Sequence, residues 1–260
     1  MSYSYYNGQE YKSRPPLSEV EGFMLASAVS GAILSPLAYV GKPFLKHLEK
    51  EEINNSVYKD CFERTANSEL FSDLGVKVIP AQNQIINNMY KEGTNACFIP
   101  STKQVLINTD KIAIAGFHEL GHALNALKSK YGVKYLAKMR GPGYAIAGLM
   151  EYFAIFSRSK PKGAKRNVTD VIEDNCGKIA FAAMLPVVAE EAIASHRGIK
   201  LAKASGLSKE MIKSMKSLYT KALATYGARA ALGGFAVYIS RKIMDYFTRP
   251  RLVKQDDYLG

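Results

Sequence analysis

Residues 118–122 read His118-Glu119-Leu120-Gly121-His122, and this stretch decides which fold the sequence indicates. On an α-helix, side chains four residues apart project from one face, so both imidazoles can reach one metal ion. Glu119 is turned by about 100° around the helix axis. From there its carboxylate can take a proton from a water on the metal without binding the metal itself. The pattern therefore predicts a zinc site of the kind that hydrolyses peptide bonds.

The surrounding residues predict the helix that carries this motif. Thr109 or Asp110 can cap its start, and Gly132 can close it. Its apolar positions repeat at helical spacing, at Ile114, Phe117, Leu120, Leu124 and Leu127. Gly121 costs about 1 kcal/mol relative to alanine, which indicates close approach of a neighbouring backbone. The alternative is an incidental pair of histidines, which chance gives in about one such sequence in a few hundred.

The third metal ligand must come from elsewhere in the chain, because a catalytic zinc has three protein ligands and one open position. His196 is the only histidine after His122, and it does not have the short metzincin spacing. Glu190 and Glu191 lie on a run that can form a helix, in apolar surroundings where an unpaired carboxylate is costly. We expect one of these two glutamates to face the metal.

Residues 191–195, Glu-Ala-Ile-Ala-Ser, resemble the ligand segment of bacterial membrane zinc metallopeptidases, in which Ala-Ser follows the ligand glutamate by three and four positions. Together with residues 118–122, this makes the chain similar to the gluzincins, zinc peptidases that have a later glutamate ligand. The resemblance implies that Glu191 is the ligand and Glu190 a neighbour. Arg197 falls on a basic position of the family pattern. Ser195 departs from it, because several gluzincins carry an aspartate there.

A second likeness lies before the motif. Residues 95–100 and 105–108 resemble the strand pair that precedes the zinc helix in membrane-bound peptidases. In that family an edge strand holds extended substrate by backbone hydrogen bonds, so the resemblance implies this role for residues 103–107 or 96–99. The two likenesses together cover about residues 75 to 245.

The expected activity is that of a zinc-dependent metalloendopeptidase. His118, His122 and Glu191 would hold Zn²⁺, which lowers the pKa of a bound water towards about 7. Glu119 would accept the proton of the water and pass it to the leaving amine of a peptide or protein substrate. Two alternatives remain open, a non-catalytic zinc-stabilised protein and a basic membrane-surface interaction protein.

Several residues are candidates for supporting roles. Tyr226, Arg197 or His196 could donate to the oxyanion, and Tyr226 falls where the resembling family has a tyrosine. Asn125, on the zinc helix, could hold a ligand in place, although a solvent-exposed asparagine is the alternative.

The expected fold is α+β and mostly helical, a single zincin-like domain over residues 18–260 after a flexible tail at 1–17. A small sheet precedes the zinc helix. The expected elements are helices at 20–40, 43–71 and 81–91, strands at 76–79, 95–100 and 104–108, a helical hairpin at 143–189, a glutamate-bearing helix at 178–204 and a helical pair at 208–245.

Membrane association is the expected location, with a cytoplasmic protein as the alternative. Residues 22–41 contain no charge, so the segment 20–41 is a transmembrane or buried helix, and the hairpin at 143–189 is a second apolar candidate. The net charge of +12 suits anionic membrane lipids as partners. No nucleic-acid motif accompanies it, so nucleic acid is not expected as a partner. Three cysteines without metal-type spacing give no disulfide framework.

Overall fold

The computed structural model describes residues 3–6, 9–12, 18–35, 56–80, 96–161 and 164–252. The chain divides into two compact units. Unit 1 consists of Met1–Pro36, Pro142–Leu185 and Ala228–Gly260, and unit 2 of Leu37–Gly141 and Pro186–Gly227. The sequence predicted one domain over 18–260, because nothing in its composition marks a boundary inside the helices that the units share.

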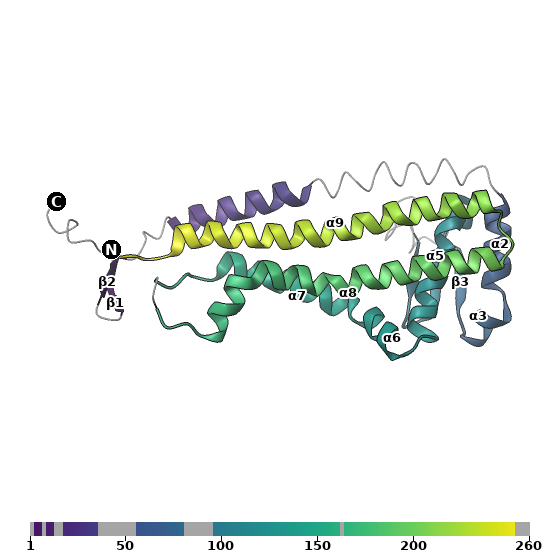
Figure 1. Ribbon diagram of the computed structural model, residues 1–260, viewed down its shortest axis with the longest axis horizontal. Helices are drawn as coiled ribbons and strands as arrows, with labels where there is room; N and C mark the ends of the chain where they lie inside the picture. The colour runs from purple at the N-terminus through teal and green to yellow at the C-terminus, as the bar shows by residue number, and fades with distance from the viewer. Residues whose placement is uncertain are drawn as a thin grey trace. The chain divides into compact units, whose positions relative to one another are not determined.

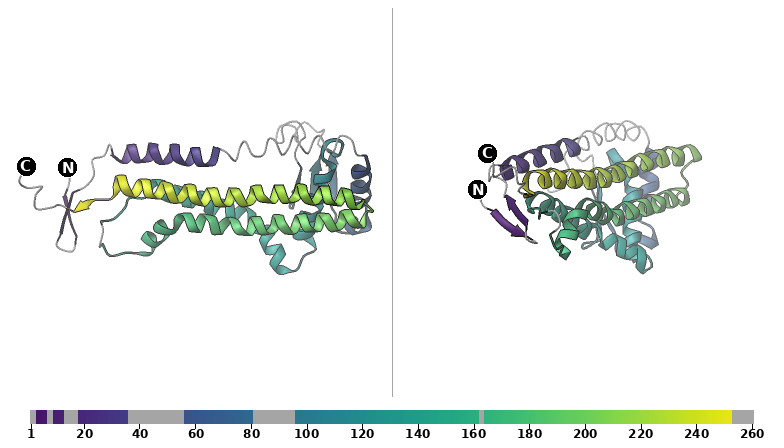
Figure 2. Two further views of the ribbon diagram at one scale, coloured as in Figure 1. Left: turned by 45° about the horizontal axis from the view of Figure 1, so that its top comes forward. Right: turned by 60° about the vertical axis from the view of Figure 1, so that its left-hand side comes forward.

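Unit 2 contains the predicted metal motif. Its own elements are α2 (Ser56–Ala66), α3 (Glu69–Asp73), β3 (Lys77–Pro80), β4 (Cys97–Ile99), β5 (Gln104–Ile107), α5 (Thr109–Leu127) and α6 (Tyr131–Lys138). Two long helices, α8 (Val168–Ala204) and α9 (Lys209–Thr248), contribute to both units (Figure 1). Within each unit they lie side by side (Figure 2).

The sheet of unit 2 has the strand order β3-β5-β4. β3 runs parallel to β5, with Val78 opposite Val105, and β4 runs antiparallel to it, with Phe98 opposite Val105. The described residues are thus mostly helical with a small sheet before α5, which confirms the α+β class predicted from the sequence. The predicted helix at 81–91 lies outside the described residues.

The core of unit 2 forms where α5 packs between α2, the sheet and the two long helices. Its buried apolar side chains include Phe62, Val105, Phe117, Leu120 and Met215. Gly116 makes room for the Phe62 ring, because a Cβ there would lie 2.4 Å from the nearest ring atom. Burial of this apolar set fixes α5 and the residues that it carries.

Unit 1 contains a helix at residues 18–35, α7 (Arg140–Phe156) and the parts of α8 and α9 assigned to it. Met150, Ala154, Cys176, Ala180 and Val237 form its small apolar cluster. A second sheet has the order β1-β2-β6, from β1 (Tyr3–Tyr6), β2 (Gln9–Lys12) and β6 (Arg251–Leu252).

Three differences from the sequence expectations concern the ends of the chain and its long helices. Residues 3–6 and 9–12 form strands rather than a flexible tail, because β2 pairs with β6 from the opposite end of the chain. The expected helical pair at 208–245 is the single helix α9, since nothing within it ends the helical run. The expected hairpin at 143–189 corresponds to α7 and the first part of α8, joined by residues 157–167, and α8 continues to Ala204 through Pro186.

Membrane-crossing helices were a further expectation. Among the residues that the structure describes, none of the helices combines the length and the apolar character needed to cross a membrane. The first candidate for a transmembrane helix was the segment 20–41, and the structure describes this segment up to residue 35.

Candidate metal centre

The zinc helix predicted from the sequence is α5, but its ends differ from the prediction. Its N-cap is Asn108, whose side chain accepts a hydrogen bond from the backbone N–H of Asp110 at 3.1 Å. The helix ends at Leu127 rather than at Gly132, which instead lies in α6. Ile112 has non-helical backbone angles, so the first turn is kinked relative to the part that carries the motif.

α5 crosses α8 at two glycines, and this crossing creates the site. A Cβ on Gly121 would lie only 2.1 Å from the carbonyl oxygen of Ala194, and one on Gly198 would lie 2.6 Å from that of Phe117. The close backbone approach expected from Gly121 is thereby confirmed. It places the motif of α5 directly against Glu190 and Glu191 of α8.

Three donor atoms converge at this crossing. Nε2 of His118 lies 3.0 Å from Nε2 of His122 and 3.0 Å from Oε2 of Glu191, and the His122 to Glu191 distance is 3.6 Å. Ligands about 2.1 Å from a tetrahedral zinc would be about 3.4 Å from one another. The triangle therefore has the size that a zinc site needs.

The other ring nitrogen of each histidine has its own partner. Nδ1 of His118 lies 3.1 Å from Oγ of Ser195, and Nδ1 of His122 lies 2.8 Å from Oε1 of Glu190. Such contacts fix the tautomer and the orientation of a ligating imidazole, so that Nε2 faces the metal. Ser195, the residue at which the sequence departs from the gluzincin pattern, thus contacts His118. Because Ser195 lies four residues after Glu191 on one helix, their spacing could have indicated that both face the same site.

Glu190 is the centre of a buried polar network behind the ligands. Asn125 is fully buried and donates from Nδ2 to Oε1 of Glu190 at 2.8 Å. Nη1 of Arg140 donates to Oε2 of Glu190 at 2.9 Å, and its Nη2 lies 2.7 Å from Oε1 of Glu191. Asn125 is therefore a supporting residue rather than a solvent-exposed one. Arg140 was missed, because no spacing in the sequence relates it to the motif.

The close contacts between histidines and glutamates shift the pKa values of the site. Burial disfavours a charge on His122, but its hydrogen bonds with Glu190 and Glu191 outweigh this and raise the pKa of His122 to about 10. Burial likewise opposes ionisation of Glu191, yet His118 and His122 hold the pKa of Glu191 well below its ordinary range. When both imidazoles are neutral, as metal binding requires, Glu119, Glu190, Glu191 and Arg140 carry a formal charge of −2 together, which a divalent cation would neutralise.

Glu119 is nearly buried beside the histidines and belongs to the group of possible metal-holding atoms formed with His118 and His122. A second such group consists of His122, Glu190 and Glu191. The contacts of Glu190 with Asn125 and Arg140 favour a supporting role for it. Glu191 is the carboxylate that faces both Nε2 atoms.

The three candidate oxyanion donors differ in their surroundings. Tyr226 is half-buried and close enough to Arg140 to affect it electrostatically. Arg197 donates from Nη1 to Oγ of Ser129 at 2.5 Å, and His196 is exposed. Another tyrosine, Tyr219, packs with its ring 5.4 Å from that of His118, but its hydroxyl donates to the carbonyl of Ile114.

The order of the strands corrects one expectation about substrate binding. β5 has β3 on one side and β4 on the other, so residues 103–107 do not form an edge strand and cannot pair with a substrate. The reason is the parallel partner β3, whose pairing with β5 the sequence does not reveal. Among the described strands of this sheet, β4, within the other expected segment at 96–99, does lie at an edge.

No family model, curated protein or solved structure matches this chain. The class of the site must therefore be inferred from its own residues. Those residues form a buried cluster of histidines and glutamates whose donor atoms are close enough together to hold a metal ion.

Proposed function

We propose that this protein is a zinc-dependent metalloendopeptidase whose metal ligands are His118, His122 and Glu191. The observation that carries the proposal is the convergence of two Nε2 atoms and one carboxylate oxygen within 3.0 to 3.6 Å. Two imidazoles and one carboxylate are a ligand set of catalytic zinc, which keeps its fourth position open. Other divalent ions favour different donor sets, such as all-oxygen sites for magnesium and calcium.

When bound, zinc supplies Lewis-acid polarisation of the scissile carbonyl and makes water a better nucleophile at neutral pH. The chain's own residues supply the rest. Glu119 takes the proton from the attacking water and delivers it to the nitrogen of the leaving amine. His118 and His122 keep their orientation through Ser195 and Glu190.

Negative charge on the carbonyl oxygen also needs a donor. Arg140 is well placed for this role, because its Nη1 lies 3.4 Å from Nε2 of His122, at the border of the ligand triangle. Tyr226, which interacts electrostatically with Arg140, is the second candidate. An extended peptide could pair with the edge strand β4, and pairing of that kind reads backbone shape more than sequence.

The test compares metal content and peptide cleavage in the same preparations. Wild type, Glu119→Gln and the exposed control Glu63→Gln are analysed for zinc and incubated with a library of quenched fluorescent peptides. We expect one zinc per chain in all three, with cleavage by wild type and Glu63→Gln only. Full cleavage by Glu119→Gln would refute the assignment of the base.

The second candidate is a zinc site that stabilises the fold without catalysis, favoured by the depth at which Glu190 and Glu191 are buried. It predicts bound zinc in wild type, no cleavage of any library peptide, and a loss of stability on chelation. Absence of zinc after expression in zinc-supplemented medium would exclude both proposals.

A further inference from the structure

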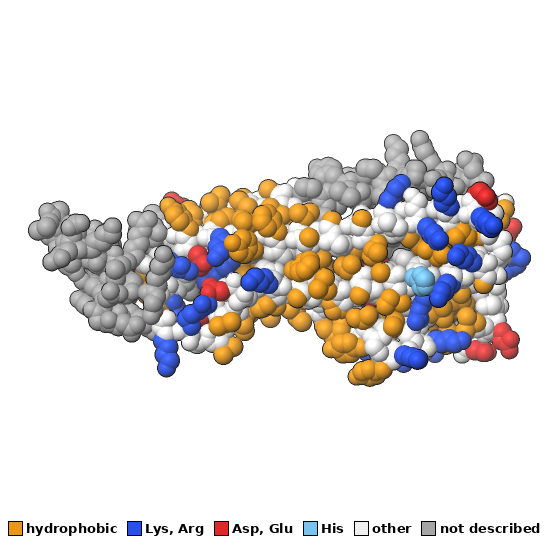
Figure 3. Space-filling model, viewed as in Figure 1, with side chains coloured by type: hydrophobic (Ala, Val, Ile, Leu, Met, Phe, Trp, Pro, Cys, Tyr) orange, Lys and Arg blue, Asp and Glu red, His pale blue; other side chains and the backbone are white. Residues whose placement is uncertain are grey.

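The exposed apolar side chains of the described residues gather in unit 1. Nineteen large hydrophobic residues are exposed, and sixteen of them belong to this unit. They come from all four of its helical segments, for example Phe23, Leu149, Tyr152, Phe181 and Phe235. Figure 3 shows hydrophobic side chains spread over α7, α8 and α9. Such a patch marks a surface that binds a partner or a membrane, since monomers in water rarely expose one.

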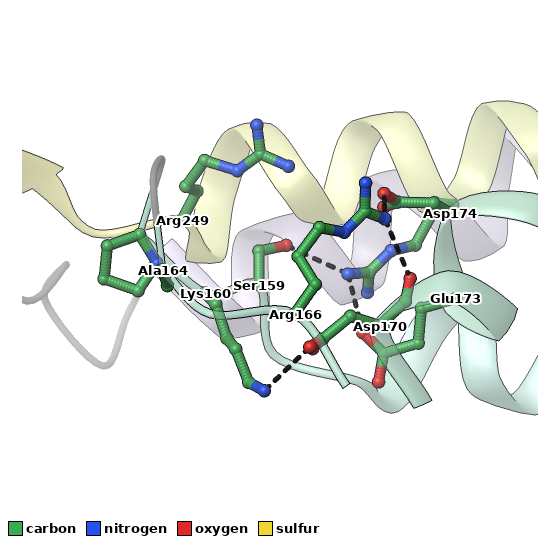
Figure 4. A pocket seen from close by; sticks show the side chains of 10 residues that line it. Ser159, Lys160, Ala164, Arg166, Asp170, Glu173, Asp174 and Arg249 are labelled. Atoms are coloured by element: carbon green, nitrogen blue, oxygen red, sulfur yellow. Dashed lines mark hydrogen bonds and ion pairs between the residues drawn. The ribbon is translucent and has the colours of Figure 1, made fainter. Parts of the chain in front are cut away.

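The interior of unit 1 contains buried charged and polar side chains. Arg241 is buried and bonds through Nη2 to Glu173 at 3.0 Å, and the same atom lies 3.1 Å from Asp245. Ser30, also buried, donates to Glu151 at 2.9 Å. Beside this network lies a cavity of about 210 Å³, lined by ion pairs such as Lys160 with Asp170 (Figure 4). These charges are paired with one another, so the cavity is a structural feature of the unit.

The contrast with unit 2 is pronounced. The largest cluster of buried hydrophobic residues in unit 2 has twenty members and that in unit 1 has five, and in total twenty-three and twelve of the described buried hydrophobic residues belong to the two units. A domain stabilised in water buries its large apolar side chains and exposes its charges. Unit 1 departs from this at its surface, where sixteen large apolar side chains are exposed, as is expected where part of the surroundings is apolar.

The helices of unit 1 also pack by backbone contact. A Cβ on Gly177 of α8 would lie 2.7 Å from the carbonyl oxygen of Gly234 in α9, and one on Gly234 would lie 2.9 Å from that of Gly177. Small residues that let two backbones meet are common in helix pairs in lipid, and the crossing of α5 and α8 shows that they also occur in the core of unit 2.

The chemistry of the surface favours lipid over a protein partner. Two of its exposed tyrosines have cations beside them, with Arg229 above the Tyr144 ring at 5.6 Å and Lys242 above Tyr238 at 5.4 Å. Tyrosine rings next to Lys and Arg suit the boundary between acyl chains and headgroups. Unit 1 carries 14 Lys and Arg residues against 10 Asp and Glu residues, and this positive excess favours anionic headgroups.

We propose that the apolar exterior of unit 1, formed by the helix at 18–35 with α7, α8 and α9, is a membrane-binding surface that enters the acyl region of anionic bilayers. This inference rests on unit 1 alone and does not depend on the peptidase proposal.

The experiment uses the full chain with an environment-sensitive NBD label at one engineered cysteine. Leu149→Cys in unit 1 and Tyr135→Cys in unit 2 form a matched pair, because the native side chains are 50% and 51% exposed. Half-buried Cys97 is replaced by serine in both, and Cys61 and Cys176 are buried. Vesicles contain phosphatidylcholine and phosphatidylglycerol at three to one, with phosphatidylcholine vesicles for comparison.

We expect anionic vesicles to shift the emission of the label at 149 to the blue and to raise it severalfold, with little change at 135. The double substitution Leu149→Glu with Phe156→Glu should lower co-flotation with vesicles at least tenfold. Tyr131→Glu with Tyr135→Glu should leave it unchanged.

Three outcomes would overturn the proposal. The label at 149 could stay in a polar environment at all lipid concentrations, or labels 149 and 135 could respond equally. The label at 149 could also shift without vesicles as the protein concentration rises, together with dimer formation in sedimentation, which would assign the surface to a second copy of the chain. Zinc content, measured on the same samples, reports on the metal site separately.

Discussion

Oε2 of Glu191 lies 3.0 Å from Nε2 of His118, although 73 positions separate the two residues in the chain. The contact exists because α5 and α8 cross at Gly121 and Gly198 with their backbones almost touching. A helix pair held this closely positions its side chains rigidly, as a metal site requires. The following predictions test this arrangement and the residues around it.

Glu191 and Glu190 should differ in their effect on zinc. Glu191→Ala removes a ligand, so we expect no stoichiometric zinc in the purified protein. Glu190→Ala removes the partner of His122 Nδ1, which should weaken zinc affinity by about 10- to 100-fold without abolishing binding. Elemental analysis and competition with a chromogenic chelator measure both. Equal zinc loss in the two variants would mean that Glu191 has no special role.

Ser195→Ala should weaken zinc binding by about tenfold, because Nδ1 of His118 loses its partner. Ser129→Ala is the control, since Ser129 contacts Arg197 rather than a histidine. The same chelator competition provides the measurement. An affinity for Ser195→Ala that matches the control would show that His118 is oriented by other groups.

Gly121→Ala should destabilise the protein by about 3 kcal/mol and disrupt zinc binding, because its Cβ would overlap the carbonyl oxygen of Ala194. Gly132→Ala is the matched control in α6, where no atom lies within 4 Å of the added Cβ. That variant should gain about 0.5 to 1 kcal/mol. Urea unfolding followed by circular dichroism gives both values. If Gly121→Ala is as stable as wild type, the two backbones are not in contact.

Arg140→Ala should lower the stability of the zinc-free protein by about 2 kcal/mol, since it removes the guanidinium that pairs with the buried carboxylates of Glu190 and Glu191. The guanidinium side chain is 35% exposed, which keeps the loss below that of a fully buried pair. Zinc restores a positive charge next to Glu191, so its addition should reduce the difference from wild type. Unfolding with zinc and with EDTA checks this. If zinc does not reduce the loss of stability, Arg140 and zinc do not both neutralise the buried glutamates.

The stability of unit 1 should depend on pH through Asp170. Its carboxylate bonds to Nζ of Lys160 at 2.8 Å and accepts from the backbone N–H of Asn167 at 2.6 Å, and these bonds hold the pKa of Asp170 below its ordinary value of 3.8. A lowered pKa stabilises the folded state above 3.8, and this stabilisation disappears as the pH falls through the lowered pKa.

Asp170→Asn should therefore unfold more readily than wild type at pH 7, and the two proteins should converge in acid. Because Asn167 and Asp170 cap the start of α8 reciprocally, the loss should appear first at that helix end. NMR titration of the Asp170 carboxyl group measures the pKa directly. A midpoint at or above 3.8 would contradict the contact with Lys160.

Local patterns in the sequence determined much of this protein. Helical periodicity gave α5, alternation and turn residues indicated β4 and β5, and the His-Glu-x-x-His spacing put His118, Glu119 and His122 together on one helix. These features depend on neighbours within a few residues, so they can be read from the chain directly. Even Gly121 indicated a close backbone, because a glycine inside a helix needs a reason.

Only the tertiary structure showed which residues and strands that are far apart in the sequence are in contact. The family resemblance implied that Glu191 is the ligand, but the residues alone left the two glutamates open, and the crossing of α5 and α8 was needed to place Glu191 against the Nε2 atoms and Glu190 against Nδ1 of His122. Arg140 has no periodic relation to the motif, and the pairing of β3 with β5 or of β2 with β6 joins distant strands. The outward apolar face of unit 1 also emerged only in three dimensions, since a hydrophobic residue in a sequence does not reveal which side of the helix is covered.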